Sequence, residues 1–263
     1  MTRPASKADQ PSSCVQETAS GLRAWNIEVG NFFFRHRNAV FPVVFLLVVL
    51  TMRPRIIGTP SLDRLLILAG VLVAVAGEAL RLVTIGFDYI DRGGKNRKVY
   101  ASRLVQGGVY GLTRNPMYLA NGMIAVGMTM LTGSPLTYVL VIPFFLFVYQ
   151  AIISAEEAFL HKQFGRDYEE YCTRANRILP SFRGIREAFA GMRYNWKRSL
   201  KQDLSTIAGV LMGLILIPFC RTFFLGGWPA ARAEAPSVLA LSSLVGLLYG
   251  LLVFLKKRQR LFY

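Results

Sequence analysis

Charged and aromatic side chains flank a pair of apolar segments near the middle of the chain, and their types suit recognition of a zwitterion. Arg114 precedes the first apolar segment, and Glu156 and Glu157 follow the second. An arginine can bind a carboxylate through two parallel hydrogen bonds, and a carboxylate can bind an ammonium group. Tyr110 and Tyr118 lie close to Arg114 in the sequence and would flank such a site.

The sequence predicts that these charges meet at one end of a helical hairpin. The apolar segments Met117–Thr132 and Leu136–Ala155 are separated by only three turn residues, so they must pack as antiparallel neighbours. Arg114 lies 20 residues before Ser134 in the turn, and Glu156 lies 22 residues after it. At a rise of about 1.5 Å per residue, the two ends differ in depth by only about 3 Å.

The composition is that of a membrane protein. Hydrophobic residues make up 53% of the chain and charged residues 17%, and the mean hydropathy is +0.37. Segments that reach or approach the length needed to cross a bilayer are Ala39–Met52, Leu65–Phe87, Met117–Thr132, Leu136–Ala155, Leu204–Leu225 and Val238–Leu255. The predicted fold class is therefore all-α, a polytopic transmembrane bundle of about six spans with an interfacial or cytosolic helix after the fourth.

Most of the Lys and Arg residues that give the net charge of +16 lie in segments expected on one side of the membrane. With six spans and a cytoplasmic N-terminus, the segments on the cytoplasmic side carry 25 of the 31 Lys and Arg residues. The positive-inside bias explains this placement, and anionic lipid headgroups are its natural partners. No aromatic-rich RNA-binding motif accompanies the charge. We therefore expect membrane lipids and no nucleic acid as partners, with both termini in the cytoplasm.

The chain divides into three predicted regions. Residues 1–38 form a disordered and then interfacial N-terminal segment, which lacks the apolar core and cleavage site of a signal peptide. Residues 39–180 form the membrane core, which ends in an amphipathic helix over Ala155–Pro180. Residues 181–263 form a basic connector and two additional transmembrane helices.

Two ionisable residues lie inside the second apolar segment. Glu78 and Arg81 are three residues apart, a spacing that allows them to pair on one helical face. Ionisable groups within a membrane are costly and usually face the bundle interior or water. We interpret them as a structural ion pair that locks this helix to its neighbours, with the lining of a cofactor or substrate cavity as the functional alternative. The cysteines show no metal-ligand or disulfide spacing, and no metal site is predicted.

At three motifs the chain resembles the isoprenylcysteine carboxyl methyltransferase and phospholipid methyltransferase superfamily of integral membrane enzymes. The motifs are GEALR in the second span, LVQGGVYGLTRNPMYL before the third, and AEEAFLHKQFGRDYEEYCTRANRILP after the fourth. Together they cover roughly residues 65–180, and their order and position at the bilayer edges make the joint signal specific. The chain has Asn115 where the family often has His, a variant common in bacterial members, and Ala175-Asn176 where eukaryotic carboxyl methyltransferases have Val-Pro. A bacterial inner (plasma) membrane is the expected location.

The resemblance implies methyl transfer from S-adenosylmethionine by a fold unrelated to soluble methyltransferases. The ammonium of this cofactor would bind the paired glutamates, its carboxylate would bind Arg114, and its sulfonium would lie beside the tyrosines. The implied cofactor-binding residues are Tyr110, Arg114, Asn115, Pro116, Tyr118, Leu119, Glu156 and Glu157. The implied catalytic residues are Arg114, Tyr118 and Glu157, and the implied substrate-binding residues are Glu78, Arg81, Tyr168, Tyr171 and Arg177.

The acceptor stays open among a lipophilic or membrane-associated carboxylate, amine or thiol, and the oligomeric state is also open. A carboxylate or thiolate needs no general base, whereas an amine must arrive neutral and could transfer a proton to Glu157, Glu78 or His161. The alternatives are a transporter, against which stands the lack of internal repeats, and a non-catalytic scaffold, against which stand the retained Arg114 and glutamates.

Overall fold

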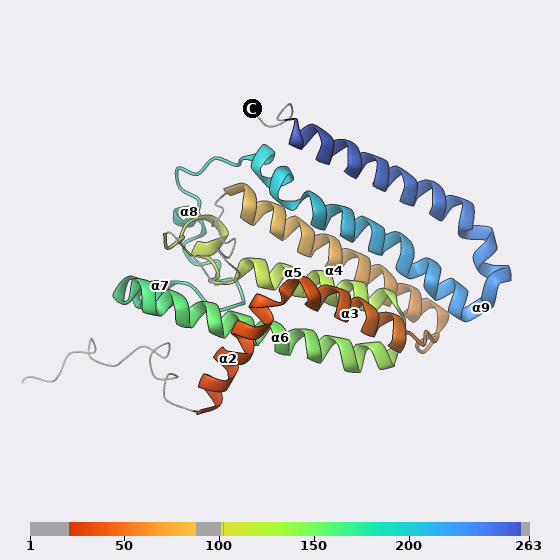
Figure 1. Cartoon of the computed structure of the whole chain (residues 1–263), viewed down its shortest axis with the longest axis horizontal. Helices are drawn as coiled ribbons and strands as arrows, with labels where there is room; N and C mark the ends of the chain where they lie inside the picture. Colours follow the sequence, from red (N-terminus) through yellow and green to blue (C-terminus); the bar gives the residue numbers. More distant parts are fainter. Residues whose placement is uncertain (1–20, 88–100, 102, 259–263) are drawn as a thin grey trace, which may run out of the picture.

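The structure is a computed structural model that describes residues 21–87, 101 and 103–258, and these residues are predominantly helical (Figure 1). The elements are α2 (Gly21–Arg35), α3 (Arg37–Thr51), α4 (Pro60–Phe87), the 3-10 turn η4 (Gly108–Gly111), α5 (Pro116–Leu131), α6 (Pro135–Phe164), α7 (Arg166–Arg174), α8 (Ile185–Ala188) and α9 (Trp196–Lys257). The all-helical prediction is thus confirmed for the described residues. The predicted disorder of the first 20 residues lies outside them.

Three of the described helices, α4, α6 and α9, are long and apolar enough to cross a membrane, and α5 is a shorter apolar helix of 16 residues. The 62-residue α9 consists of two arms, because Gly227 adopts a non-helical φ of 66° and ψ of −168°. The two arms run antiparallel (Figure 1), and Lys256 Nζ near the end of the second arm donates to the Lys201 carbonyl in the first arm at 2.7 Å. These arms contain the two predicted C-terminal spans; the total of six spans stays a prediction.

The predicted antiparallel hairpin is formed by α5 and α6. Helix α5 ends at Leu131 and α6 begins at Pro135, so the turn between them is short. Ser134 closes the turn: its hydroxyl accepts from the backbone N–H of Thr137 at 3.3 Å and donates to the carbonyl of Thr51 at 3.1 Å. The hairpin turn is thereby joined to the end of α3.

Small residues allow α4 and α5 to approach closely. A Cβ added at Gly127 of α5 would lie 2.5 Å from backbone atoms of Gly70 and Ala74 on α4. A Cβ at Gly77 of α4 would lie 2.7 Å from the carbonyl oxygen of Ala120. Close approach of backbones through small residues is a common way for helices to associate in a membrane, where van der Waals packing replaces the hydrophobic effect.

Two buried ion pairs attach the first arm of α9 to α4. Arg81 Nε contacts the Asp203 carboxylate at 3.0 Å, and Arg221 Nη2 contacts Asp63 Oδ2 at 2.6 Å. At about 1.5 Å per residue, the two pairs are separated by about 27 Å along α9. This arm therefore packs against the core over most of its length.

The predicted helix from Ala155 to Pro180 is wrong in extent. Helix α6 continues to Phe164, Gly165 interrupts it at φ 49° and ψ −119°, and α7 ends at Arg174. The chain then leaves the helical path to pair with the loop before α5, where the Arg114 N–H donates to the Asn176 carbonyl at 2.8 Å. This pairing carries the end of the segment back to the mouth of the hairpin.

We expect Gly165→Ala to destabilise the protein by about 1–3 kcal/mol, because a residue with a Cβ is strained at this φ and ψ. No atom lies within 4 Å of the added methyl group, so strain alone would cause the loss. Thermal unfolding in detergent measures it. The control is Gly209→Ala in α9, which has similar space and no positive φ and should be neutral or stabilising. Equal unfolding temperatures for the two variants would contradict the prediction.

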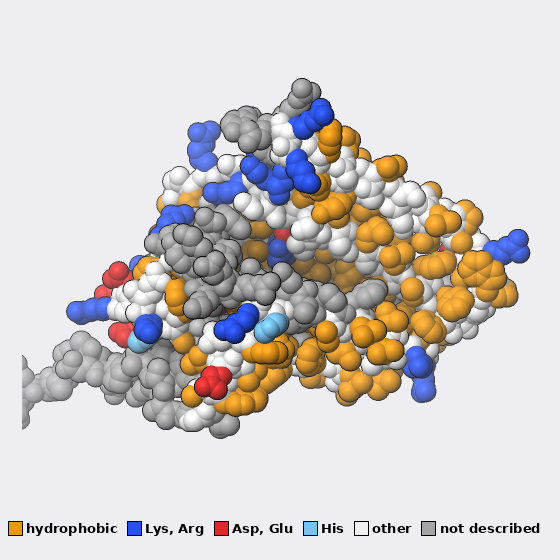
Figure 2. Space-filling view, in the orientation of Figure 1, with side chains coloured by type: hydrophobic (Ala, Val, Ile, Leu, Met, Phe, Trp, Pro, Cys, Tyr) orange, Lys and Arg blue, Asp and Glu red, His pale blue; other side chains and the backbone are white. Residues whose placement is uncertain are grey.

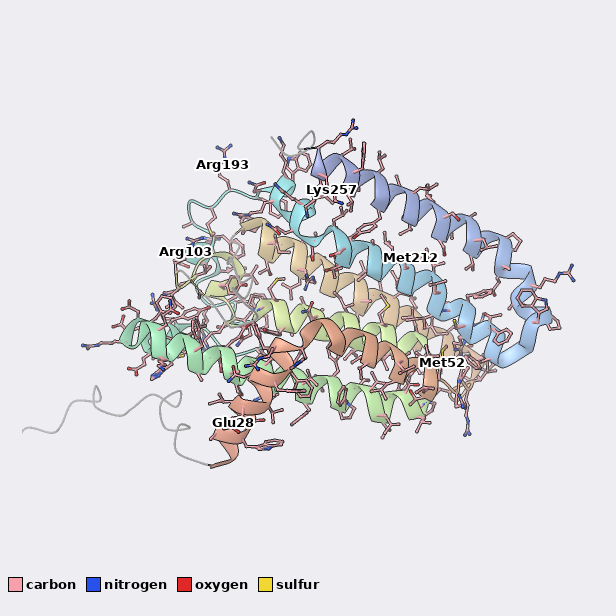
Figure 3. All side chains as sticks on the ribbon, viewed as in Figure 1. Glu28, Met52, Arg103, Arg193, Met212 and Lys257 are labelled. Carbon is pink, nitrogen blue, oxygen red and sulfur yellow. The ribbon has the colours of Figure 1, made fainter. Side chains whose placement is uncertain are left out.

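Basic residues and apolar surface occupy different parts of the molecule. Figure 2 shows hydrophobic side chains spread over the flanks of the bundle, with many of the Lys and Arg side chains toward the end that holds α7, α8 and both ends of α9. Figure 3 places Arg103, Arg193 and Lys257 toward this end, and Met52 toward the opposite end. We call the end that holds these three basic residues the basic end.

Candidate functional site

The structure brings Arg114 and Glu157 together at the mouth of the α5–α6 hairpin. Arg114 Nε lies 3.3 Å from Glu157 Oε1, and both side chains are largely buried. Asn115 Nδ2 donates to the same carboxylate oxygen at 3.1 Å. Arg177 Nε donates to Glu157 Oε2 at 2.8 Å. We call Arg114, Asn115, Ser154, Glu157 and Arg177, together with the adjacent Glu156 and its partner Tyr118, the rim cluster.

Glu157 is the centre of the rim cluster, since both of its carboxylate oxygens accept charge-assisted hydrogen bonds. Arg177 also donates from Nη2 to the hydroxyl of Ser154 at 3.0 Å, one helical turn before Glu157. Arg114 donates from Nη1 to the carbonyl of Cys172 at 3.3 Å. A buried carboxylate with two guanidinium partners holds the loop before α5, helix α6 and the segment after α7 together.

The loop before α5 positions two members of the rim cluster. Pro116 is the first residue of α5, where its missing N–H costs nothing, and Asn115 is the N-cap residue. The Asn115 side chain makes no cap hydrogen bond; it donates to Glu157 and, at 3.0 Å, to the carbonyl of Arg177. The Thr113 hydroxyl donates to the carbonyl of Ile178 at 2.8 Å. Pro116 is buried and Leu119 half-buried in the first turn.

The neighbouring acid Glu156 points to a different partner. The Tyr118 hydroxyl donates to Glu156 Oε1 at 2.7 Å, and Glu156 is buried. The Tyr118 ring packs edge-on against Tyr149, with ring centroids 5.3 Å apart. The two adjacent glutamates therefore have different partners. Glu157 accepts from the two arginines, and Glu156 accepts from Tyr118.

The remaining predicted tyrosines lie in hydrophobic packing around this region. Tyr168 and Tyr171 of α7 pack with Ala101 and Leu160, and the Tyr171 hydroxyl donates to the Tyr110 carbonyl at 2.7 Å. The Tyr110 ring belongs to a separate buried cluster. A role for Tyr168 and Tyr171 in substrate binding stays a prediction. His161 contacts Glu169 at 2.9 Å in a partly exposed position.

The predicted pairing of Glu78 with Arg81 is wrong. Arg81 instead donates to Asp203 and, at 3.2 Å, to the Thr206 hydroxyl, both on α9, and to the side-chain oxygen of Asn121 on α5. The side chain of Asp203 is fully buried. Helix α9 supplies the partner of Arg81. The Asp203 carboxylate accepts hydrogen bonds from the guanidinium, whereas Glu78, on the same helix as Arg81, accepts none from the described residues. We call Glu78, Arg81, Asn121, Asp203 and Thr206 the inner cluster.

Two polar groups beside Arg81 have no hydrogen-bond partner among the described residues. Both carboxylate oxygens of Glu78 and the hydroxyl of Tyr149 are buried and unbonded. Glu78 is within electrostatic reach of Arg81 and Asp203, and the Tyr149 hydroxyl lies near Asn121 without forming a hydrogen bond of good geometry. Buried polar groups without partners are rare and often mark functional positions.

The sequence-based prediction leaves out four members of these clusters and the neighbouring Tyr149; the four are Ser154, Asn121, Asp203 and Thr206. Asp203 stands just before the first C-terminal apolar segment, and Asn121 and Tyr149 are polar residues inside the hairpin helices. A polar side chain at an intramembrane position is itself a signal, and an acid near the basic end is a natural partner for a buried arginine. The sequence alone does not say which helix faces which.

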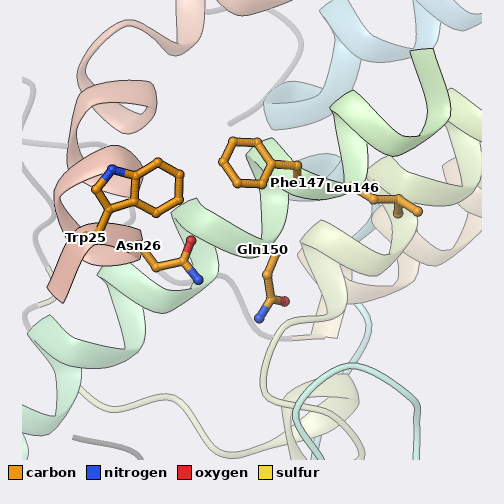
Figure 4. A pocket seen from close by; sticks show the side chains of 5 residues that line it. All are labelled: Trp25, Asn26, Leu146, Phe147 and Gln150. Carbon is orange, nitrogen blue, oxygen red and sulfur yellow. The ribbon is translucent and has the colours of Figure 1, made fainter. Parts of the chain in front are cut away.

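An open groove lies apart from both clusters, between α2 and α6 (Figure 4). Its volume is about 530 Å³, and its lining residues are Trp25, Asn26, Leu146, Phe147 and Gln150. The rings of Trp25 and Phe147 face each other across it with centroids 6.0 Å apart. None of these residues is ionisable, so the groove does not offer the charges that the rim cluster offers.

Comparison with known proteins agrees with the motifs. Residues 64–167 match the family model described as phospholipid methyltransferase. No curated protein and no solved structure matches the chain significantly. The matched residues include most of α4, the α5–α6 hairpin, Arg114, Glu156 and Glu157; Arg177 and Asp203 follow them. The match confirms the predicted resemblance to phospholipid methyltransferases for this segment, which is less than half of the chain.

Proposed function

We propose that this protein transfers a methyl group from S-adenosylmethionine to a lipophilic acceptor that is in the membrane or associated with it. The family match over residues 64–167 carries the proposal. Within that segment, Arg114 contacts Glu157 and Tyr118 contacts Glu156 at the mouth of one hairpin. These are the residue types that the two charged groups of an amino acid require.

The chemistry of the rim cluster fits the amino-acid end of this cofactor. The guanidinium groups of Arg114 and Arg177 have the planar geometry that binds a carboxylate. Glu156, which already accepts a hydrogen bond from Tyr118, can accept another from an ammonium group. Glu157 would then orient the two arginines, since both of its oxygens receive their N–H groups.

The protein contributes mainly orientation and exclusion of water. When bound, the cofactor supplies an electrophilic methyl group: the acceptor lone pair forms the new bond to carbon as the carbon–sulfur bond breaks and leaves its electrons on sulfur. The burial of Glu156 and Glu157 keeps the site dry, and the rings of Tyr118 and Tyr149 can lie beside a sulfonium cation. Positioning of this kind can supply a large part of the rate acceleration in a displacement reaction.

Calorimetry with S-adenosylmethionine on the detergent-purified protein tests the cofactor. We expect binding in the micromolar range, about −8 kcal/mol, and a loss of at least about tenfold in Glu156→Gln, because the amide cannot balance an ammonium charge. Glu169→Gln is the control: this acid lies outside the rim cluster and is partly exposed. An affinity unchanged by Glu156→Gln would contradict the assignment of this residue, and no binding by the native protein would contradict the function.

Methyl-labelled cofactor and a lipid extract test the acceptor. We expect labelled, organic-soluble product in the presence of the protein, and at least about tenfold less with Glu156→Gln at a cofactor concentration below the dissociation constant of the native protein. Transfer to water-soluble small molecules alone would contradict a membrane acceptor.

A further inference from the structure

Arg81 is held away from the acid that lies nearest to it along its own helix. Glu78 and Arg81 are three residues apart in α4, a spacing at which oppositely charged side chains normally pair. Three side chains of other helices bind the guanidinium instead: Asp203 and Thr206 from α9, and Asn121 from α5. Asp203 is fully buried and contacts both Nε and Nη2, so it is the main partner.

As a result, Glu78 is buried and has no hydrogen-bond partner among the described residues. Its exposed fraction is 8%, and neither carboxylate oxygen accepts a hydrogen bond from the described residues. Leaving a carboxylate in this condition is costly in a membrane interior, where an arginine is available three residues away. Asp203 binds the arginine that would otherwise be the nearest partner of Glu78.

We propose that Asp203 holds Arg81 so that Glu78 remains available to bind a hydrogen-bond donor of the acceptor, an ammonium or a hydroxyl group. Asp203 is then a positioning residue on the first arm of α9, outside the segment that matches the family. The arrangement of Glu78, Arg81 and Asp203 does not depend on the proposed methyltransferase function. The statement that the ligand of Glu78 is a methyl acceptor rests on that function.

The position of Glu78 relative to the rim cluster supports this role. The Tyr149 hydroxyl, also without a hydrogen-bond partner, lies near Asn121, and the Tyr149 ring packs against Tyr118, which bonds Glu156. The packed rings of Tyr149 and Tyr118 thus link the inner cluster to the rim cluster. Figure 2 shows that one face of the bundle is hollowed near its middle, with an acidic and a basic side chain visible there, so a lipophilic molecule could approach the interior from the side.

Labelling with a lipophilic carbodiimide tests the role of Asp203, because such reagents modify carboxyl groups that lie in apolar surroundings outside ion pairs. We expect modification of Glu78, identified by peptide mass spectrometry and absent in Glu78→Gln. Asp203→Asn should slow this modification about tenfold, since the released Arg81 pairs with Glu78. The double variant Asp203→Asn/Arg81→Gln should restore it, which separates local pairing from general misfolding.

The matched control is Asp63→Asn, which breaks the other ion pair between α4 and α9. It should leave the labelling of Glu78 unchanged. Labelling that is unaffected by Asp203→Asn, or slowed equally by Asp63→Asn, would overturn the proposed role of Asp203.

Protection from the same reagent tests the ligand. We expect N,N-dimethyldodecylamine, a tertiary amine that cannot couple to the activated carboxyl, or dodecanol to protect Glu78, and dodecyl methyl ether, which has no hydrogen-bond donor, to give no protection. Protection by the amine alone identifies an ammonium ligand, and protection by the alcohol alone identifies a hydroxyl ligand. Protection by neither, or equal protection by the ether, would overturn this part of the proposal. Cofactor binding is measured separately, so its absence would reject the methyltransferase function without affecting the labelling result.

Discussion

Arg114→Ala is expected to abolish measurable binding of S-adenosylmethionine, with an affinity loss of at least about 100-fold. The substitution removes a guanidinium that contacts Glu157 at 3.3 Å and is proposed to bind the cofactor carboxylate. Truncating one partner of a buried, hydrogen-bonded charge pair at a binding interface commonly costs about 2–5 kcal/mol of binding free energy, and about 2.7 kcal/mol corresponds to 100-fold in affinity. Calorimetry on the detergent-purified variant measures the effect.

Two further variants separate the binding role of Arg114 from general damage. Arg114→Lys keeps the positive charge without the planar pair of donors, so it should retain weaker binding than the native protein. Arg166→Ala removes an arginine whose contact with Glu170, at 3.9 Å, is exposed on α7, so it should have no measurable effect. Native affinity in Arg114→Ala would remove this residue from the cofactor site.

Gly127→Leu is expected to destabilise the protein severely, because α4 leaves no room for a side chain at this position. Even a Cβ would lie 2.5 Å from the Gly70 carbonyl oxygen and from the Ala74 nitrogen, both of which belong to the α4 backbone. The backbone cannot move aside as a flexible side chain could, so the helices must separate. Overpacking of a core typically costs about 1–3 kcal/mol and occasionally more, and a backbone clash belongs to the upper part of that range.

The matched control for Gly127→Leu is Gly122→Leu on the same helix. A Cβ at Gly122 would meet no atom within 4 Å, and leucine has a higher helix propensity than glycine. Thermal unfolding in detergent, followed by circular dichroism, should show a large decrease in midpoint for the first variant only. Similar midpoints for the two would mean that α4 and α5 do not pack as closely as the structure shows.

Several features of the fold follow from short stretches of sequence. The three-residue turn between two apolar segments requires an antiparallel hairpin, and the rise of a helix then places Arg114 and Glu157 at a common depth. The glycine and proline residues of this turn affect only the local backbone, so the turn can be predicted without knowledge of the rest of the molecule. The two predicted C-terminal spans likewise place their connection between Leu225 and Val238, and the bend at Gly227 lies there.

The partner of each charged residue was decided by tertiary structure. Sequence spacing predicted that Glu78 would pair with Arg81, but Asp203, 122 residues later in the chain, binds the arginine instead. The two adjacent glutamates looked equivalent, yet Glu157 meets the arginines and Glu156 meets Tyr118. Which helix lies beside which, and how each is rotated, depends on long-range packing that no local pattern records.

The end of α7 is a second feature that local sequence predicts only in part. The amphipathic pattern after Ala155 indicated a helix, and the helix exists as far as Arg174. Periodicity could not show where it stops, because the chain leaves the helix to form backbone hydrogen bonds with the loop before α5. Local spacing therefore determined the hairpin and the types of charge at its mouth. Contacts between distant segments decided which charges are paired and left Glu78 without a hydrogen-bond partner among the described residues.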